Sequence, residues 1–208
     1  MKVLFLGCHC DDIELGCGAT IHHFRKKWDI HCLVLSKKGL HNKFPKLYKN
    51  CQKAMKELGV KNLEFANFET GYFYETRQQI WEKLNEIDLR IKPDLVFSQE
   101  KDDHQDHKIL WNETKRNFRK SSLIQYTVMR SSIGFVPNLF FELNKKDLKA
   151  KIKSLKNYKM YTNSKNYFTP LNTEASLRNS GIYIESEFSE SFKIKKLVFN
   201  EKNSNFNF

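Results

Sequence analysis

Short apolar runs alternate with longer segments of helical periodicity over the first half of the chain. Strands are expected at four of these runs, which are too short for an ordinary helix: 2–6, 30–35, 62–68 and 94–97. Helices are expected between them, where apolar residues recur three or four positions apart, over 15–24, 46–58, 75–91 and about 110–118. This alternation predicts a mostly parallel sheet with strands buried on both faces by helices.

The order of elements changes beyond residue 118. Further strands are expected at 123–129, 139–143 and 192–199, together with a lysine-rich helix over 146–160. With 208 residues and 40% hydrophobic content, the chain has the size of one ordinary domain with its own core. The sequence therefore predicts a single Rossmann-like α/β domain over 1–199, followed by a loose tail over 200–208.

Charge and cysteine content limit the environment in which such a chain works. A net charge of +12 favours polyanions such as nucleic acid, anionic lipid headgroups or phosphorylated small molecules, although a solvated lysine-rich surface would give the same number. The five cysteines are an odd number without the spacing of a disulfide framework, which predicts a reduced, cytoplasmic protein. No stretch approaches the roughly twenty apolar residues of a membrane span, so any membrane contact is expected to be peripheral.

Two polar clusters follow strands of the alternating series. Because the carboxyl ends of parallel strands meet at one edge of a sheet, the clusters at 9–14 and 102–107 are expected to lie together. They combine imidazoles and carboxylates: His9, Asp11, Asp12, Glu14, Asp102, Asp103, His104, Asp106 and His107. This mixture suits zinc or another first-row divalent ion.

The spacing of these residues suggests a catalytic metal site. Catalytic zinc takes three protein ligands and keeps a fourth position for water. His9 and Asp12 could reach one ion from one side, and His107 could supply the third ligand. An acidic neighbour that does not bind the ion, such as Asp11, could then take a proton from the bound water.

Three other interpretations of the first cluster compete with this one. Gly16 and Gly18 form only part of a dinucleotide-binding pattern, and the carboxylates before them would repel a pyrophosphate. The acidic pair after a first strand is also typical of a phosphoacceptor domain, which leaves His104 and His107 unexplained. A structural zinc could instead use Cys8, His9, Cys10 and Cys17, although alternate residues at a strand end point in opposite directions.

The two clusters also carry a resemblance to a known family. The segment from His9 to Gly18 (His-Cys-Asp-Asp-Ile-Glu-Leu-Gly-Cys-Gly) resembles the His-Pro-Asp-Asp-x-x-x-Gly signature of the PIG-L/LmbE-like family of zinc-dependent N-acetylglucosaminyl de-N-acetylases. His104-Gln-Asp-His107 is similar to that family's second motif, His-x-Asp-His. Further similarity at 51–60, 77–80 and 183–192 extends it over most of the chain.

The resemblance implies a role for each residue of the two motifs. It implies that zinc is bound by His9, Asp12 and His107. Asp11 matches the general base, and His104 matches the histidine that stabilises the oxyanion or protonates the departing amine. Asp106 would orient a histidine.

Three positions depart from the family's pattern. Cys10 stands in place of the usual proline and Gln105 in place of a frequent one, and neither is a ligand position. Near Thr70-Gly71-Tyr72 many relatives place a charged residue that contacts the sugar, and this chain has none there.

The resulting expectation is a zinc-dependent hydrolase that removes an acyl group, most simply acetyl, from the amino group of a free or conjugated amino sugar. No nucleic-acid partner is then expected, and self-association into a homo-oligomer is compatible with it. The alternative is a basic, catalytically silent binding module for nucleic acid or anionic glycolipid, supported by the charge and the aromatic content alone.

Overall fold

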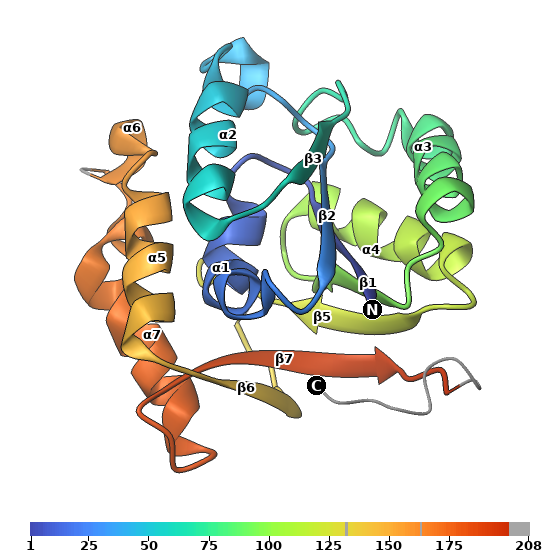
Figure 1. Cartoon of the computed structure of the whole chain (residues 1–208). Coiled ribbons are helices and arrows are strands. Elements are labelled where there is room, and N and C mark those ends of the chain that lie inside the picture. Colours follow the sequence, from blue (N-terminus) through green and yellow to red (C-terminus); the bar gives the residue numbers. More distant parts are fainter. Residues whose placement is uncertain (132, 163, 200–208) are drawn as a thin grey trace.

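A computed structural model describes residues 1–131, 133–162 and 164–199, so the tail predicted for 200–208 lies outside the described residues. Its centre is a seven-stranded sheet with the order β3-β2-β1-β4-β5-β7-β6 (Figure 1). In chain order the strands are β1 (Lys2–Gly7), β2 (Asp29–Val34), β3 (Asn62–Phe65), β4 (Leu95–Gln99), β5 (Ser122–Tyr126), β6 (Leu139–Leu143) and β7 (Phe188–Lys196). The first five are parallel, whereas β7 runs antiparallel to both β5 and β6.

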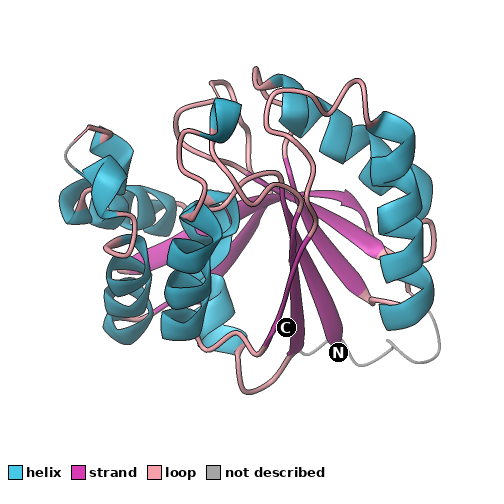
Figure 2. Cartoon of the chain, turned by 90° about the horizontal axis from the view of Figure 1, so that it is seen from above, coloured by secondary structure: helices cyan, strands magenta, loops and turns pink. Residues whose placement is uncertain are grey.

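Helices cover both faces of the sheet (Figure 2). They are α1 (Asp12–Phe24), α2 (Leu47–Leu58), α3 (Arg77–Ile91), α4 (Gln105–Asn117), α5 (Lys145–Leu155), the short α6 (Lys159–Thr162) and α7 (Pro170–Ile182). Two 3₁₀ turns, η1 (Leu40–Asn42) and η2 (Asn166–Phe168), complete the described elements. Among these residues, no helix is long and apolar enough to cross a bilayer.

The alternation of side chains along β1 divides the core into two layers. Val3 and Phe5 pack with apolar residues of α1, α2 and α5. Leu4 and Leu6 point the other way and pack with α3 and α4. A strand buried on both faces in this way explains why β1 is apolar at every position after Lys2. The expected Rossmann-like α/β fold is thereby confirmed.

The carboxy-terminal part departs from the sequence prediction in three places. The single helix expected over 146–160 is two, α5 and α6, and the last strand begins at Phe188 rather than at 192. Helix α7 was not predicted at all. It buries only Thr173, Leu177 and Gly181, so it has almost no apolar stripe from which periodicity could reveal it.

The strand order places a crevice next to β1. The chain leaves β1 toward β2 on one side, whereas β4 lies on the other side of β1, so the loops after β1 and β4 turn away from each other. In open α/β sheets, ligands bind at such a switch point, outside the carboxyl ends of the strands.

Candidate metal centre

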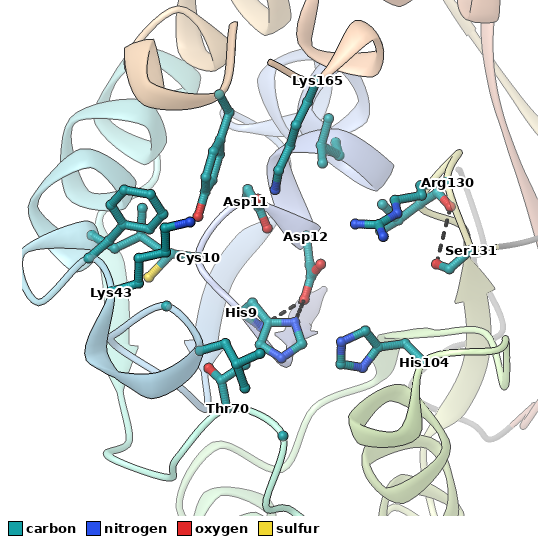
Figure 3. Close-up of a pocket in the computed structure, with 18 of the residues that line it drawn as sticks. His9, Cys10, Asp11, Asp12, Lys43, Thr70, His104, Arg130, Ser131 and Lys165 are labelled. Carbon is teal, nitrogen blue, oxygen red and sulfur yellow. Dashed lines mark hydrogen bonds and ion pairs between the residues drawn. The ribbon is translucent and has the colours of Figure 1, made fainter. Parts of the chain in front are cut away.

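The two polar clusters line one cavity at this switch point. The cavity has a volume of about 950 Å³, and its wall includes His9, Asp11 and Asp12 from the loop after β1 and His104 and His107 from the start of α4. Figure 3 shows the side chains of His9, Asp12 and His104 directed toward one another across it. The convergence expected from two strand ends is therefore present in the fold.

Asp12 is the carboxylate around which the two clusters meet. It begins α1 and is only 3% exposed. Its Oδ2 accepts the backbone N–H of His9 at 2.7 Å and lies 3.3 Å from His9 Nδ1. Its Oδ1 lies 3.8 Å from His107 Nε2. One buried carboxylate thus faces a ring nitrogen of each histidine, with separations suited to ligands that share an ion.

The second nitrogen of each of these rings is held by another carboxylate. His9 Nε2 donates to Asp106 Oδ2 at 2.9 Å, and His107 Nδ1 donates to Asp102 Oδ2 at 2.7 Å. Both carboxylates are fixed in turn, Asp106 by the backbone N–H of Gly71 and Asp102 by the hydroxyl of Ser131. Pairs of this kind set the tautomer and orientation of metal-binding histidines.

The donor atoms nevertheless fall into two groups rather than one compact set. The first group is formed by Cys8, Asp12 and His107, and the second by His9, His104 and Asp106. Within each group the donor atoms lie within 4.8 Å of one another. The predicted ligands His9, Asp12 and His107 therefore span both groups, connected through Asp12. Glu14 is not among them, because it is buried beneath the cavity and accepts the hydroxyl of Tyr158 at 2.5 Å.

Of two further residues near the predicted ligands, the sequence analysis missed Gln99 and considered Cys8 only for a structural zinc. Gln99 ends β4, where its Nε2 donates to His107 Nε2 at 2.8 Å and its Oε1 accepts the backbone N–H of Cys8 at 2.9 Å. The thiol of Cys8 is itself fully buried beside Asp12. The available signal was position: each lies at the end of an apolar strand, directly before a polar cluster.

The electrostatics of the cluster favour positive charge. Burial by itself would lower the pKa of His9, but the charge of Asp12 and the hydrogen bond to Asp106 outweigh it and raise this pKa to about 10. Burial would raise the pKa of Asp12, yet the charges of His9 and His107 hold it well below its usual range. Carboxylates that stabilise a cationic imidazole to this extent would also stabilise a divalent cation bound among the same donors.

Asp11 differs from Asp12 in conformation and in contacts. Its φ of 124° lies in the left-handed region, which is strained for a residue with a side chain. Its carboxylate lines the cavity and makes no hydrogen bond to any side chain or backbone group of the described residues. Burial and the neighbouring charge of Asp12 raise its pKa, and the ammonium of Lys165 opposes them.

His104 is oriented by the start of α4. As the N-cap residue, its Nδ1 accepts the backbone N–H of Asp106 at 3.2 Å, which leaves the ring proton on Nε2. Burial and the positive charges of His9 and His107 lower its pKa to about 4. Its ring stacks on that of His107, with centroids 4.6 Å apart.

Two of the competing interpretations of the first cluster, the structural zinc and the dinucleotide site, do not fit the observed packing. Cys8 belongs to the core layer with α3 and α4, whereas Cys10 and Cys17 belong to the opposite layer, so a structural zinc on all of them is not assembled. Gly16 serves packing, because a Cβ there would lie 2.1 Å from the ring of Tyr126. That close approach explains the glycine without a bound dinucleotide.

Solved structures with this architecture include proteins of different activity. The conserved protein TT1542 from Thermus thermophilus matches with a TM-score of 0.77 at 19% identity, over 95% of this chain and 96% of that one. N,N'-diacetylchitobiose deacetylase from Pyrococcus horikoshii matches with 0.62 at 17% identity, over 93% and 83%. The 4-carboxy-2-hydroxymuconate hydratase GalB from Pseudomonas putida KT2440 matches with 0.71 at 14% identity, over 96% and 98%. At such identities the likeness shows the fold alone.

Sequence comparison gives the family. No curated protein sequence matches the chain. The family model for PIG-L, described as GlcNAc-PI de-N-acetylase, matches residues 4–116. That range runs from β1 through nearly all of α4 and contains both polar clusters. The chain therefore belongs to the PIG-L family.

Proposed function

We propose that the protein is a metal-dependent amide hydrolase that removes an acyl group, most simply acetyl, from the amino group of an amino sugar. The observation that carries this proposal is the arrangement of His9, Asp12 and His107 around a cavity, with Asp11 open to it. The family description and the deacetylase among the similar structures support the same reaction class.

The donor chemistry supports a divalent ion as the cofactor, with zinc the first choice. Two imidazoles and one carboxylate are a common ligand set of hydrolytic zinc sites. His107 presents the unprotonated Nε2 that such a ligand needs, because its proton is held on Nδ1 by Asp102. An ion bound there would polarise the substrate carbonyl and acidify a water molecule.

The remaining residues of the cavity are suited to the proton transfers of amide hydrolysis. Asp11, with no competing hydrogen bond among the described residues, would take the proton of the attacking water as the C–O bond forms. His104 carries its proton on Nε2, so it can donate to the developing oxyanion. When the C–N bond breaks, the acyl group leaves as a carboxylate and the sugar keeps a free amine.

The experiment is to measure metal content and acetate release on the same purified protein. We expect about one zinc per chain and release of acetate from N-acetylglucosamine or its conjugates, lost on chelation and restored by zinc. A metal-free protein that releases no acetate and binds oligonucleotides with strong salt dependence would instead support the binding-module alternative.

A further inference from the structure

A buried ion pair lies against the middle of α1. Lys151 of α5 and Glu190 of β7 are 5% and 4% exposed, and Lys151 Nζ lies 2.6 Å from Glu190 Oε1. Both come from segments far along the chain, which pack against α1 in the fold (Figure 1). Burying two charges is costly unless each finds further partners, so the remaining contacts of the pair decide what it does.

The remaining contacts go to the backbone of α1. Glu190 accepts the N–H of Ala19 on Oε1 at 3.0 Å and the N–H of Thr20 on Oε2 at 2.7 Å. Lys151 Nζ donates to the carbonyl of Leu15 at 2.6 Å. In a regular helix the N–H of residue 19 pairs with the carbonyl of residue 15. Both groups of one helical hydrogen bond therefore have a charged partner from outside the helix.

These charges have the signs that stabilise the ends of helices. A carboxylate favours the N–H groups at the start of a helix, and an ammonium group favours the carbonyls at its end. The pair supplies both kinds of partner inside α1, between its first turn and its last. The first turn, which begins at Asp12, is thereby fixed to α5 and β7 and not only to the rest of its own helix.

The residues of α1 make this outside support necessary. Gly16 and Gly18 stand in the helix, and glycine is among the least favourable residues in a helix interior. Gly18 also makes room for the contact, because a Cβ there would lie 3.3 Å from Cγ of Lys151. So short and glycine-rich a stretch is weak as an isolated helix, and its geometry depends on the elements that pack against it.

The pair is connected to the cavity through Leu15. The carbonyl of Leu15 accepts Lys151, and its N–H donates to the carbonyl of Asp11 at 2.9 Å. The carboxylate of Asp11 has no hydrogen bond among the described residues, so its direction follows from its backbone, with the strained φ of 124°. The contacts that hold Leu15 therefore help to keep Asp11 in the conformation that places its carboxylate at the cavity wall.

We propose that Lys151 and Glu190 are positioning residues for the reaction: they hold Leu15, and through it the backbone that directs Asp11 toward the metal centre. This inference rests on the proposed function, because it takes Asp11 as the general base. Neither residue lines the cavity, so both act through α1 and not on the substrate. Two elements near the end of the chain thus control a loop near its beginning.

The kinetic test uses Lys151→Met and Glu190→Gln at saturating zinc. We expect kcat for acetate release, per folded molecule, to fall by about 10-fold or more while KM changes little, because a small displacement of a catalytic group is costly. The matched control is Asp147→Asn, which breaks a contact between the same two helices at the other end of α1 and should keep the wild-type kcat. Wild-type kcat in both test variants would overturn the proposal.

A double variant covers the case in which one buried charge without its partner prevents folding. Lys151→Met combined with Glu190→Gln leaves neither charge, and the carbonyl of Leu15 can then pair with the N–H of Ala19 as in a regular helix. We expect this protein to fold and to keep a low kcat, because the first turn is no longer fixed from outside. A folded double variant with wild-type kcat would show that the pair is structural only.

Hydrogen exchange followed by mass spectrometry needs neither metal nor turnover. In the single and double variants, the amides over 12–18 should exchange about 10-fold or more faster than in the wild type, relative to those of α2. Asp147→Asn should leave this segment unchanged. Unchanged exchange over 12–18 in every test variant would refute the proposal. Faster exchange in a protein that releases no acetate would support it, and the failure would then lie in the proposed function.

Discussion

Two clusters of histidine and aspartate stand out among the described residues, and they differ in that the first lines a cavity whereas the second joins two helices. In the candidate metal centre, His9 and His107 each face Asp12 with one ring nitrogen and a second carboxylate with the other. In the other cluster, His22 and His23 at the end of α1 both contact Asp147 at the start of α5.

The second cluster is closed, although it has similar residue types. Asp147 uses Oδ1 for His22 at 2.7 Å and Oδ2 for His23 at 2.8 Å, and Oδ2 also accepts the backbone N–H of Asn144. It joins two helices and completes the capping box of α5. Both oxygens of Asp147 are therefore engaged by donors of the protein itself. The comparison shows that histidine and aspartate side chains close together are not sufficient for a ligand site. They must also face a cavity that a ligand can enter.

The largest effect is expected from removing the carboxylate at the centre of the first cluster. Asp12→Asn should lose metal and acetate release together, because one of three protein ligands no longer carries charge. Metal analysis and kinetics on the same sample provide the check. Full zinc occupancy in this variant would show that Asp12 is not a metal ligand.

Changing the neighbouring aspartate should separate chemistry from metal binding. Asp11→Asn keeps a similar shape and loses only proton acceptance, so turnover should fall by roughly 10²–10⁴-fold while metal stays bound. Parallel zinc analysis and acetate-release kinetics would measure it. If Asp11→Asn lost the metal and Asp12→Asn kept it, the two roles would have to be exchanged.

A smaller effect is expected from the carboxylate behind His107. Asp102→Asn replaces the charged acceptor that holds the proton of His107 on Nδ1 by a neutral amide, and metal affinity should weaken by about 10–100-fold. Competition with a chelator of known affinity measures the change. The control is Asp103→Asn, the next residue along, whose exposed carboxylate has no such partner among the described residues and should leave affinity unchanged.

The closed cluster should affect stability rather than catalysis. Asp147→Asn replaces one of the two accepting oxygens by an NH₂ group, so one imidazole loses its acceptor and the negative charge is lost, and the free energy of unfolding should fall by about 1–3 kcal/mol. Activity per folded molecule should be unchanged, in contrast to every change in the metal centre. Asp29→Asn is the control, because Asp29 also faces a histidine, His31, but is exposed. Chemical denaturation at neutral pH compares the variants.

The same cluster gives a pH dependence with a definite sign. Burial would raise the pKa of Asp147, but the hydrogen bonds from His23 and His22 hold it below its usual value. Its contribution to stability is therefore present above the pKa of an unfolded aspartate, about 3.9, and is lost as the pH falls through the lower folded value. The difference between wild type and Asp147→Asn should hold at neutral pH and shrink below about pH 4.

Much of the fold was predictable because local burial leaves a local pattern. Helix α2 shows this: its apolar residues recur at helical spacing, and Gly59 ends it with a φ of 82°. Helix α1 begins at Asp12 rather than at Leu15, so part of the first cluster belongs to the helix. The start was missed because Asp12 and Glu14 are buried for contacts that an apolar pattern does not register.

The candidate site was predictable only in part. Two strand ends and two histidine-containing clusters were sufficient to bring His9, Asp12 and His107 to one cavity as expected. The position of Gln99 between Cys8 and His107 was not predictable, since a glutamine at the end of a strand has no fixed partner in sequence.

The sequence by itself determined the alternation of strands and helices, the two polar clusters and the membership of the PIG-L family, because each is written in residues close together along the chain. Only the tertiary structure decided that β7 turns back antiparallel beside β5, that α7 exists, and that Lys165 and Arg130 stand at one wall of the cavity. These features depend on contacts between distant segments, whose free energy comes from packing that no local pattern records.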